Sequence, residues 1–379
     1  MAGNWERYLE RWVSAGLIDS STGEVVRAYE AEQEKARGLS WQVLLAIALG
    51  GLLLAAGILL LVAAHWDRLS PPERFTLVLT LVAVMHVAGA LGATRFPVLS
   101  ATLHTVGTIC LGAGIFLAAQ IFHLQEHWPG GVMLWALGAG AAWILLRHWP
   151  QAALAAVLTP LWLAGEWSEF TQSGWIGADP VIAAGLMMFA VTYLTALSPE
   201  KQTLVRKALS WIGAITLIPM GATLIHSSQF GYSRQLSLPW GYHLLGWTAA
   251  FALPLALAWW LRGRRVWPNV IAGLWVGALS TASSLAHESV YYEIGRYPLC
   301  ALGALGLIAW GMKEGRKERI NLGIAGFALT VLFFYFSTVM DKLGRSASLI
   351  GLGLLFLLGG WLLEKTRRRL LAQLRRGEI

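Results

Sequence analysis

The chain has 379 residues, of which 56% are hydrophobic and only 13% are charged, and its mean hydropathy is +0.57. A soluble domain carries about 25% charged residues to cover its surface, so this composition excludes a water-soluble protein of two or three domains. Apolar runs long enough to cross a bilayer recur along the chain without the alternating pattern of barrel strands. Because only helices and closed barrels satisfy every backbone group in lipid, the sequence predicts an all-α, polytopic transmembrane helix bundle.

Residues 1–40 are polar and are expected to form a short cytoplasmic helical hairpin. Trp5, Leu9 and Trp12 repeat at i, i+4 and i+7, which gives the first helix one apolar stripe. Gly16 is expected to end that helix, and Ser21-Thr-Gly-Glu24 resembles a capping box that opens the second. Two interpretations stay open: the hairpin packs on the membrane surface, or it docks a cytoplasmic partner.

About twelve spans are expected in the bundle of residues 41–363, and residues 364–379 are expected to form a basic cytoplasmic tail. The fourth, fifth and tenth expected spans are short, so each could be tilted or re-entrant. The expected ranges are 41–64, 75–93, 98–120, 132–146, 151–165, 180–197, 208–225, 244–261, 267–286, 297–312, 320–340 and 346–363.

The distribution of Lys and Arg orients these spans. With the N-terminus inside, 23 of the 29 basic residues fall in inner segments, as the positive-inside rule requires. We therefore expect a multi-pass protein of a bacterial inner (plasma) membrane with both termini in the cytoplasm. The basic runs Arg262–Arg265 and Lys365–Arg369 are expected to contact anionic lipid headgroups, and no nucleic-acid partner is expected.

Several short motifs resemble those of the bacterial membrane proteins in the domain-of-unknown-function family 2157. In the first part of the chain they are Gly16-Leu-Ile-Asp19, Ala63-Ala-His-Trp-Asp67, Ala119-Gln-Ile-Phe-His-Leu124 and Trp135-Ala-Leu-Gly138. Near the C-terminus the motif is Asp341-Lys-Leu-Gly-Arg345. The resemblance covers residues 1–165 and 320–365. It implies an inner-membrane location and, as a partner, a neighbouring membrane protein with a Gly-Asp-Tyr-type motif, but no established activity.

Histidines and carboxylates gather in the expected outer loops. Imidazole beside carboxylate is what proton transfer, metal binding or acid–base chemistry requires. The sequence therefore predicts an outer polar vestibule, although these groups could simply face water. A zinc site on the His123-Leu-Gln-Glu126-His127 segment is one alternative, but the Trp-Pro-Gly-Gly that follows favours a turn, so no metal site is assigned. The vestibule residues are His65, Asp67, His123, Glu126, His127 and Asp341.

A second candidate site lies within the membrane. His86 and His104 are equidistant from Arg95, in the short loop between two expected spans. Antiparallel neighbours place both imidazoles about 13 Å from that turn, since a helix rises about 1.5 Å per residue. The pair could hydrogen-bond, relay protons or ligate haem iron; alternatively, each ring bonds a nearby hydroxyl such as that of Thr105 or Thr108. We expect no cofactor.

Three classes of function fit the sequence. The first is transport or translocation of a small polar or lipid-linked envelope molecule through the outer vestibule. The second is a non-catalytic scaffold or assembly subunit for a partner membrane protein. The third is a membrane transferase on lipid-linked substrates that uses Asp67. No H-E-x-x-H motif, P-loop or nucleophile elbow is present, so we favour a non-enzymatic role and place transport first.

Overall fold

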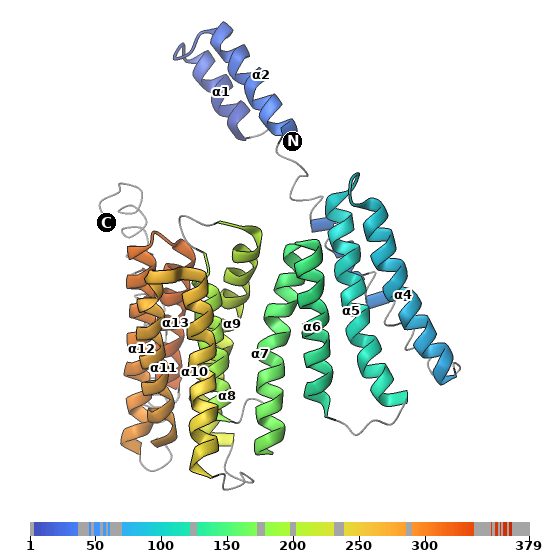
Figure 1. The fold of residues 1–379 in the computed structure, drawn as a ribbon. Coiled ribbons are helices and arrows are strands. Elements are labelled where there is room, and N and C mark those ends of the chain that lie inside the picture. The colour runs from blue at the N-terminus through green and yellow to red at the C-terminus, as the bar shows by residue number, and fades with distance from the viewer. Residues whose placement is uncertain are drawn as a thin grey trace. The chain divides into compact units, whose positions relative to one another are not determined.

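The computed structural model is helical in the part of the chain that it describes, as expected. It describes residues 4–36, 70–121, 127–172, 179–197, 202–230, 239–285 and 290–336, together with short pieces of helix between 45 and 60 and between 350 and 365. Within these residues there are α-helices and one 3-10 helix, and no strand. The elements are α1 (Asn4–Ser14), α2 (Ser20–Ala36), α4 (Pro71–Gly92), α5 (Pro97–Ile121), α6 (Trp128–Leu146), α7 (Trp149–Thr171), α8 (Pro180–Leu194), α9 (Leu204–Phe230), α10 (Trp240–Arg262), η3 (Gly263–Val266), α11 (Trp267–Leu285), α12 (Val290–Lys313) and α13 (Lys317–Phe334) (Figure 1).

The chain divides into two compact units, residues 1–110 and residues 111–379, and α5 runs across the boundary. The boundaries expected at residues 40 and 363 stay predictions, because the chain around both lies outside the described residues.

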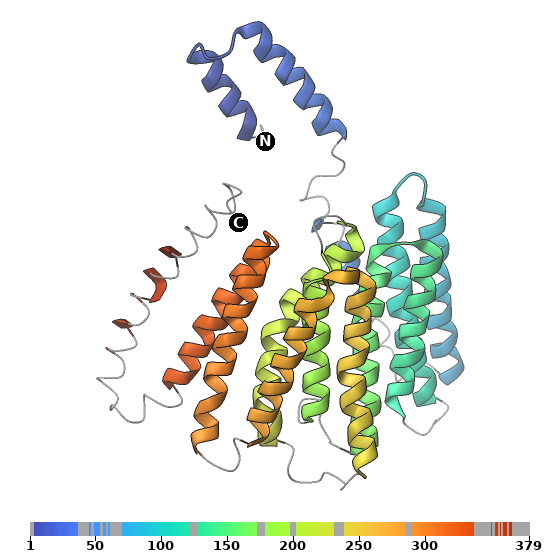
Figure 2. The ribbon, with the colours of Figure 1, turned by 60° about the vertical axis from the view of Figure 1, so that its left-hand side comes forward.

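The N-terminal hairpin consists of α1 and α2 (Figure 2). Gly16, with φ +70°, ends the first helix in the left-handed conformation that glycine adopts without strain. The second helix is capped by Asp19 rather than by the predicted box at Ser21: the Asp19 carboxylate accepts from the Ser21 hydroxyl and the Thr22 amide. These hydrogen bonds lower the pKa of Asp19 to about 2. Leu9 is buried, as the apolar stripe predicts, whereas Trp12 of the same stripe is exposed.

In the smaller unit, α4 and α5 form an antiparallel pair. The N-terminus of α4 carries two prolines, and the Glu73 carboxylate accepts 2.7 Å hydrogen bonds from the Ser70 amide and hydroxyl. Val106 and Cys110 of α5 are buried against a small apolar group on α4: Leu81, Val82 and Met85. Apolar packing therefore holds the two helices together near their middle.

In the larger unit, helices α6 to α13 alternate in direction, so their ends gather at two opposite ends of the unit (Figure 1). Three of them begin with a Trp-Pro pair, at Trp128, Trp149 and Trp267. Proline is favoured in the first turn because the amide it lacks has no partner there, and tryptophan is favoured at membrane interfaces.

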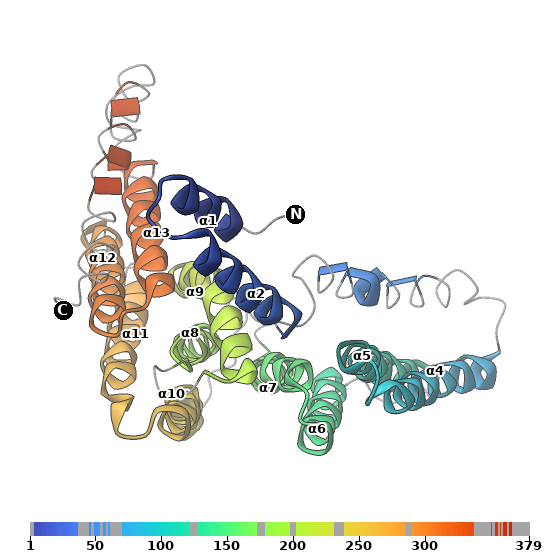
Figure 3. The ribbon, with the colours of Figure 1, turned by 90° about the horizontal axis from the view of Figure 1, so that it is seen from above.

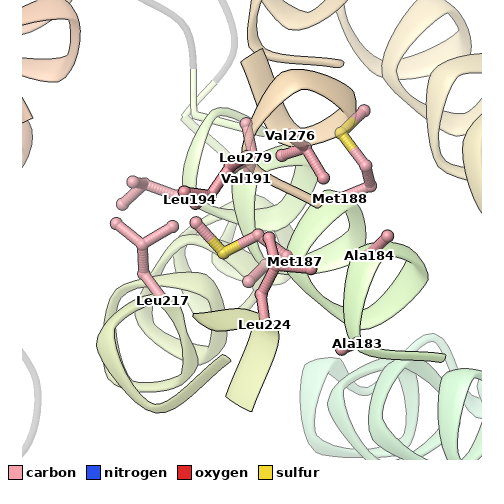
Figure 4. Packing of buried hydrophobic residues seen from close by; sticks show 11 residues of the cluster. Ala183, Ala184, Met187, Met188, Val191, Leu194, Leu217, Leu224, Val276 and Leu279 are labelled. Carbon is pink, nitrogen blue, oxygen red and sulfur yellow. The ribbon is translucent and has the colours of Figure 1, made fainter. Parts of the chain in front are cut away.

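The core of this unit is α8, a short helix that lies among its neighbours α7, α9 and α10 (Figure 3). Its sequence is apolar on all sides, which is typical of a buried helix. It packs through Met187, Met188 and Leu194 against Val276 and Leu279 of α11, and against α9 (Figure 4).

The contact between α8 and α9 depends on Gly213. A Cβ atom at this position of α9 would overlap the backbone nitrogen of Leu194 on α8. The two helix backbones therefore approach more closely than any side chain would allow.

Ten of the twelve expected ranges coincide with α4 to α13, while the first and last expected spans lie largely outside the described residues. Five described stretches are long and apolar enough to cross a membrane: Pro71–Gly92, Pro97–Ile121, Trp128–Leu146, Leu204–Ile225 and Trp240–Ala282. The last of these contains both α10 and α11. A count of twelve spans is thus not confirmed. The three expected spans that were short correspond to α6, α7 and α12, which are longer than predicted. Each of these helices begins or ends in a turn with aromatic, polar or glycine residues, which hydropathy alone assigns to a loop.

Candidate functional site

Of the six predicted vestibule residues, only His127 lies within the described residues. It precedes the first turn of α6, and its Nε2 lies 2.9 Å from Oε2 of Glu166 on α7. The other oxygen of Glu166 accepts a 2.8 Å hydrogen bond from the Trp162 indole. The carboxylate thus contacts both an imidazole and an indole, and the His127 and Glu166 side chains remain partly exposed. His65, Asp67, His123, Glu126 and Asp341 lie outside the described residues.

Two further indole–carboxylate pairs lie at the same end of the unit. Trp128 donates to Oε1 of Glu169 at 2.6 Å, and Trp167 donates to Oδ2 of Asp179 at 3.1 Å. We refer to Trp128, Trp162, Trp167, Glu166, Glu169 and Asp179 as the indole–carboxylate cluster. The sequence places Glu166 and Glu169 in a loop, whereas the structure places both in the last turns of α7.

Asp179 links this cluster to the core because it caps the N-terminus of α8. Its Oδ1 accepts from the amides of Val181 at 2.8 Å and Ile182 at 3.4 Å. Burial raises the pKa of Asp179, and the amide and indole hydrogen bonds oppose that change by favouring the carboxylate.

Beside the cluster lies a cavity of about 430 Å³ among α7, α8 and α10. Its wall is almost entirely apolar, and Glu166 and Tyr242 are its main polar lining groups. Because Glu166 also binds His127, the cavity and the cluster share one carboxylate. The apolar lining includes Leu163, Phe170, Ile182, Leu186, Leu245 and Leu253.

The intramembrane pair His86 and His104 meets on the facing sides of α4 and α5. The two Nδ1 atoms lie 2.9 Å apart, and the ring centroids are 5.2 Å apart. His104 is buried, with 4% of its surface exposed. The proximity expected from the spacing around Arg95 is present, and the Thr108 hydroxyl donates to the backbone carbonyl of residue 104. The function of the pair is a proposal.

A third polar group, absent from the sequence-based predictions, surrounds the C-terminus of α8. Arg206 donates to the Ala196 carbonyl at 2.9 Å, Arg262 to the Thr195 carbonyl at 2.7 Å and Arg319 to the Leu197 carbonyl at 3.3 Å. We call these three residues the arginine cap. They satisfy carbonyls that follow the last helical turn and place positive charge at the negative end of the helix dipole.

Glu314 joins two members of the cap. It forms ion pairs with Arg262 and Arg319, whose side chains are 3% and 2% exposed. Both guanidinium groups also lie over the ring of Trp310, at 5.3 and 5.1 Å. Burial alone would raise the pKa of Glu314, but the hydrogen bond from Arg262 and the charge of Arg319 outweigh it and lower the pKa to about 2. The expected contact of this basic run with lipid headgroups is thus wrong for Arg262, whereas Arg264 and Arg265 are exposed.

Among the described residues, no group of three or more His, Cys, Asp or Glu side chains could hold a metal ion. Cys110 and Cys300 are free thiols.

Comparison with known proteins gives one match. Residues 10–152 match the family model DUF2157, described as "Predicted membrane protein (DUF2157)". This finding confirms the resemblance in the first part of the chain and, with the apolar helices, indicates an integral membrane protein. No curated protein and no solved structure matches the chain.

Proposed function

We propose that this membrane protein, which carries the DUF2157 segment, binds an amphiphilic, lipid-linked molecule between α7, α8 and α10 and takes part in its translocation. The observation that carries the proposal is the cavity of about 430 Å³ with an apolar wall and one shared carboxylate. Ligand pockets of roughly 300–1,000 Å³ combine an apolar lining with a few placed polar groups.

The composition of the lining favours a lipid-linked molecule over a small polar one. A hydrated polar solute would lose its water in this cavity without gaining hydrogen bonds, which costs several kcal/mol for each unpaired group. An acyl or isoprenoid chain loses nothing comparable, because the cavity wall is as apolar as the lipid it leaves.

The polar part of the ligand would lie toward Glu166 and the neighbouring indoles. Glu166 already forms hydrogen bonds with His127 and Trp162. Hydrogen-bond donors and acceptors are therefore present together at one end of the cavity. This arrangement supports a headgroup site continuous with a chain site.

Two helices that flank the cavity contain a proline. Pro160 lines the cavity from α7, and Pro254 interrupts α10, where its carbonyl accepts from Thr192 of α8. Proline removes one hydrogen bond from a helix and permits bending. Bending at these positions would open and close the cavity during translocation.

The proposed orientation places the indole–carboxylate cluster at the outer surface of a bacterial inner membrane and the arginine cap at the cytoplasmic surface. Arg147 follows α6, Arg262 ends α10 and Arg316 precedes α13. These helix ends lie on one side of the larger unit (Figure 1). The positive-inside rule supports this assignment, and with it both termini in the cytoplasm.

Binding can be tested by photo-crosslinking in nanodiscs with a phospholipid that carries a diazirine in one acyl chain. Ala249 lines the cavity, whereas Ala252 on the same helix is exposed and lies outside the lining. We expect Ala249→Phe to lose most of the label on α7 and α10, and Ala252→Phe to keep it. Equal labelling of both variants and the wild type would refute a ligand site in this cavity.

Translocation is tested separately, in liposomes that contain a fluorescent phospholipid or a fluorescent polyprenyl phosphate and an impermeant quencher. The wild type should expose inner-leaflet probe faster than Ala249→Phe does. If crosslinking is present but no probe moves faster than in empty liposomes, translocation is refuted and binding stands.

A further inference from the structure

We propose that His86 and His104 form an intramembrane proton site, which binds one proton between the two Nδ1 atoms and can pass a proton from one ring to the other. The proposal does not depend on the apolar cavity or its ligand, because the site lies wholly within residues 1–110.

The geometry itself requires unequal protonation. Two identical nitrogen atoms 2.9 Å apart form a hydrogen bond only when one carries a hydrogen and the other presents a lone pair. If both Nδ1 atoms were protonated, the bond would be lost. If neither were, two lone pairs would face each other. The space between the rings therefore suits one proton.

Each ring lies on a glycine of the opposite helix. A Cβ atom at Gly89 of α4 would be 2.9 Å from Nε2 of His104, and a Cβ atom at Gly107 of α5 would be 3.0 Å from Nε2 of His86. The sequence shows the same reciprocity, because His86-Val-Ala-Gly89 and His104-Thr-Val-Gly107 repeat one spacing on the two helices. Two histidines that met by chance would not need two matched glycines, so the site is built by both helices.

The surroundings leave the pair as the main titratable group at this depth. On α4, the only other charged residues are Glu73 and Arg74 in the first turn, and between Pro97 and Ile121 α5 carries none. The described residues between 45 and 60, which include Gly51 opposite Thr102, are Leu, Ala and Gly. Cys110 lies further along α5, packed against apolar side chains. Ionisable groups at such positions are rare and are functional candidates.

Proton transfer through the pair balances without another reactant. In the neutral state, one ring has Nδ1–H and an unprotonated Nε2, and the other has the reverse. A proton added at the unprotonated Nε2 of the first ring makes it an imidazolium, and its Nδ1 proton then moves to the Nδ1 of the second ring. The second ring, now an imidazolium, releases its Nε2 proton. One proton has entered and one has left, and the tautomers have exchanged.

The same distance argues against a metal between the rings. Zn–N bonds of about 2.0–2.1 Å at a tetrahedral angle need nitrogens roughly 3.3 Å apart, and axial ligands of one haem iron must stand on opposite faces of the metal. Nitrogens in direct hydrogen-bond contact leave no room for either ion.

The site can be tested by solid-state NMR of the full-length protein in bilayers, labelled with ¹³C,¹⁵N-histidine. Protonated and unprotonated imidazole nitrogens have well-separated shifts, and His86→Gln and His104→Gln assign the signals. We expect one protonated and one unprotonated Nδ1 with a cross-peak between them. Lowering the pH should add one proton to the pair as a whole, not one proton to each ring. Two unprotonated Nδ1 atoms, or two rings that titrate independently, would overturn the proposal.

Matched glycine variants test how the site is built. Gly89→Ala should lose the cross-peak, whereas Gly92→Ala on the same helix should keep it, because an added Cβ there meets nothing within 4 Å. Transfer is tested in liposomes with an internal pH dye under a potassium diffusion potential: proton entry should fall to the empty-liposome rate in both glutamine variants. If the cross-peak persists in Gly89→Ala, the imidazole of His104 does not need the glycine of the opposite helix. Equal proton entry in the wild type and the variants would refute proton transfer.

Discussion

Replacement of Glu314 by glutamine should destabilise the larger unit, because it removes the negative charge that two buried arginines share. The Arg262 and Arg319 side chains are 3% and 2% exposed, so neither can recover its lost partner from water. A pKa lowered from 4.5 to about 2 corresponds to about 3 kcal/mol of stabilisation of the folded state. Removal of one partner of a buried ion pair costs a similar amount, about 3–5 kcal/mol.

The assay is thermal unfolding of the detergent-solubilised protein, followed by tryptophan fluorescence. A loss of about 3 kcal/mol corresponds to a fall in Tm of roughly 6–12 °C for a unit of this size. Glu318→Gln is the matched control, since Glu318 is exposed in the first turn of α13, four residues from Glu314. It should leave Tm unchanged.

The pH dependence gives a sharper test. Because the pKa of Glu314 is lower in the folded state, its stabilisation is complete above the unfolded value near 4.5 and is lost as the pH falls toward about 2. The wild type should therefore lose this stability between about pH 5 and pH 2, and Glu314→Gln should not. The reasoning fails if the two proteins unfold at the same temperature at pH 7, or if their difference is the same at pH 3.

Three further predictions follow from the fold. Gly213→Ala places a methyl group against the backbone of α8 and should abolish folded protein in size-exclusion chromatography. Gly221→Ala is the control and should fold, because the nearest neighbour of its added Cβ is 3.9 Å away. Equal recovery of the two variants would contradict the close approach of α8 and α9. Asp179→Ala removes the cap of α8 and the acceptor of Trp167, which should cost about 1–2 kcal/mol and lower Tm, more than Asp179→Asn does; an unchanged Tm would show that the cap is not stabilising. Alkaline phosphatase fused after Ile379 should stay inactive, and an active fusion would refute the proposed topology.

Features that depend on residues close together in the chain could be predicted from the sequence. The composition and the apolar runs predict a helical membrane protein, because backbone groups in lipid must bond within their own segment. The meeting of His86 and His104 is also local in origin: the two helices are joined by a short turn, and a fixed rise per residue sets both rings at one depth. The resemblance to DUF2157 proteins rests on short motifs in the same way, and the match over residues 10–152 confirms it there.

Helix ends were predicted less well for a physical reason. Hydropathy marks where side chains stop being apolar, whereas a helix continues as long as its backbone hydrogen bonds do. The final turns of α7 carry Glu166 and Glu169, whose charges suggest a loop. Only the structure shows that indoles of α6 and α7 donate hydrogen bonds to these carboxylates.

The arginine cap and the cavity were decided by tertiary structure alone. Arg262 and Arg319 reach carbonyls 67 and 122 residues away in the chain, and each stands in a basic run that, by composition, would face water or lipid headgroups. The cavity likewise takes its wall from three helices, with lining residues that run from Pro160 to Leu253 along the chain. The residue type specifies which groups a side chain can bond. Its actual partner depends on the packing of α8, which brings particular ends of other helices together.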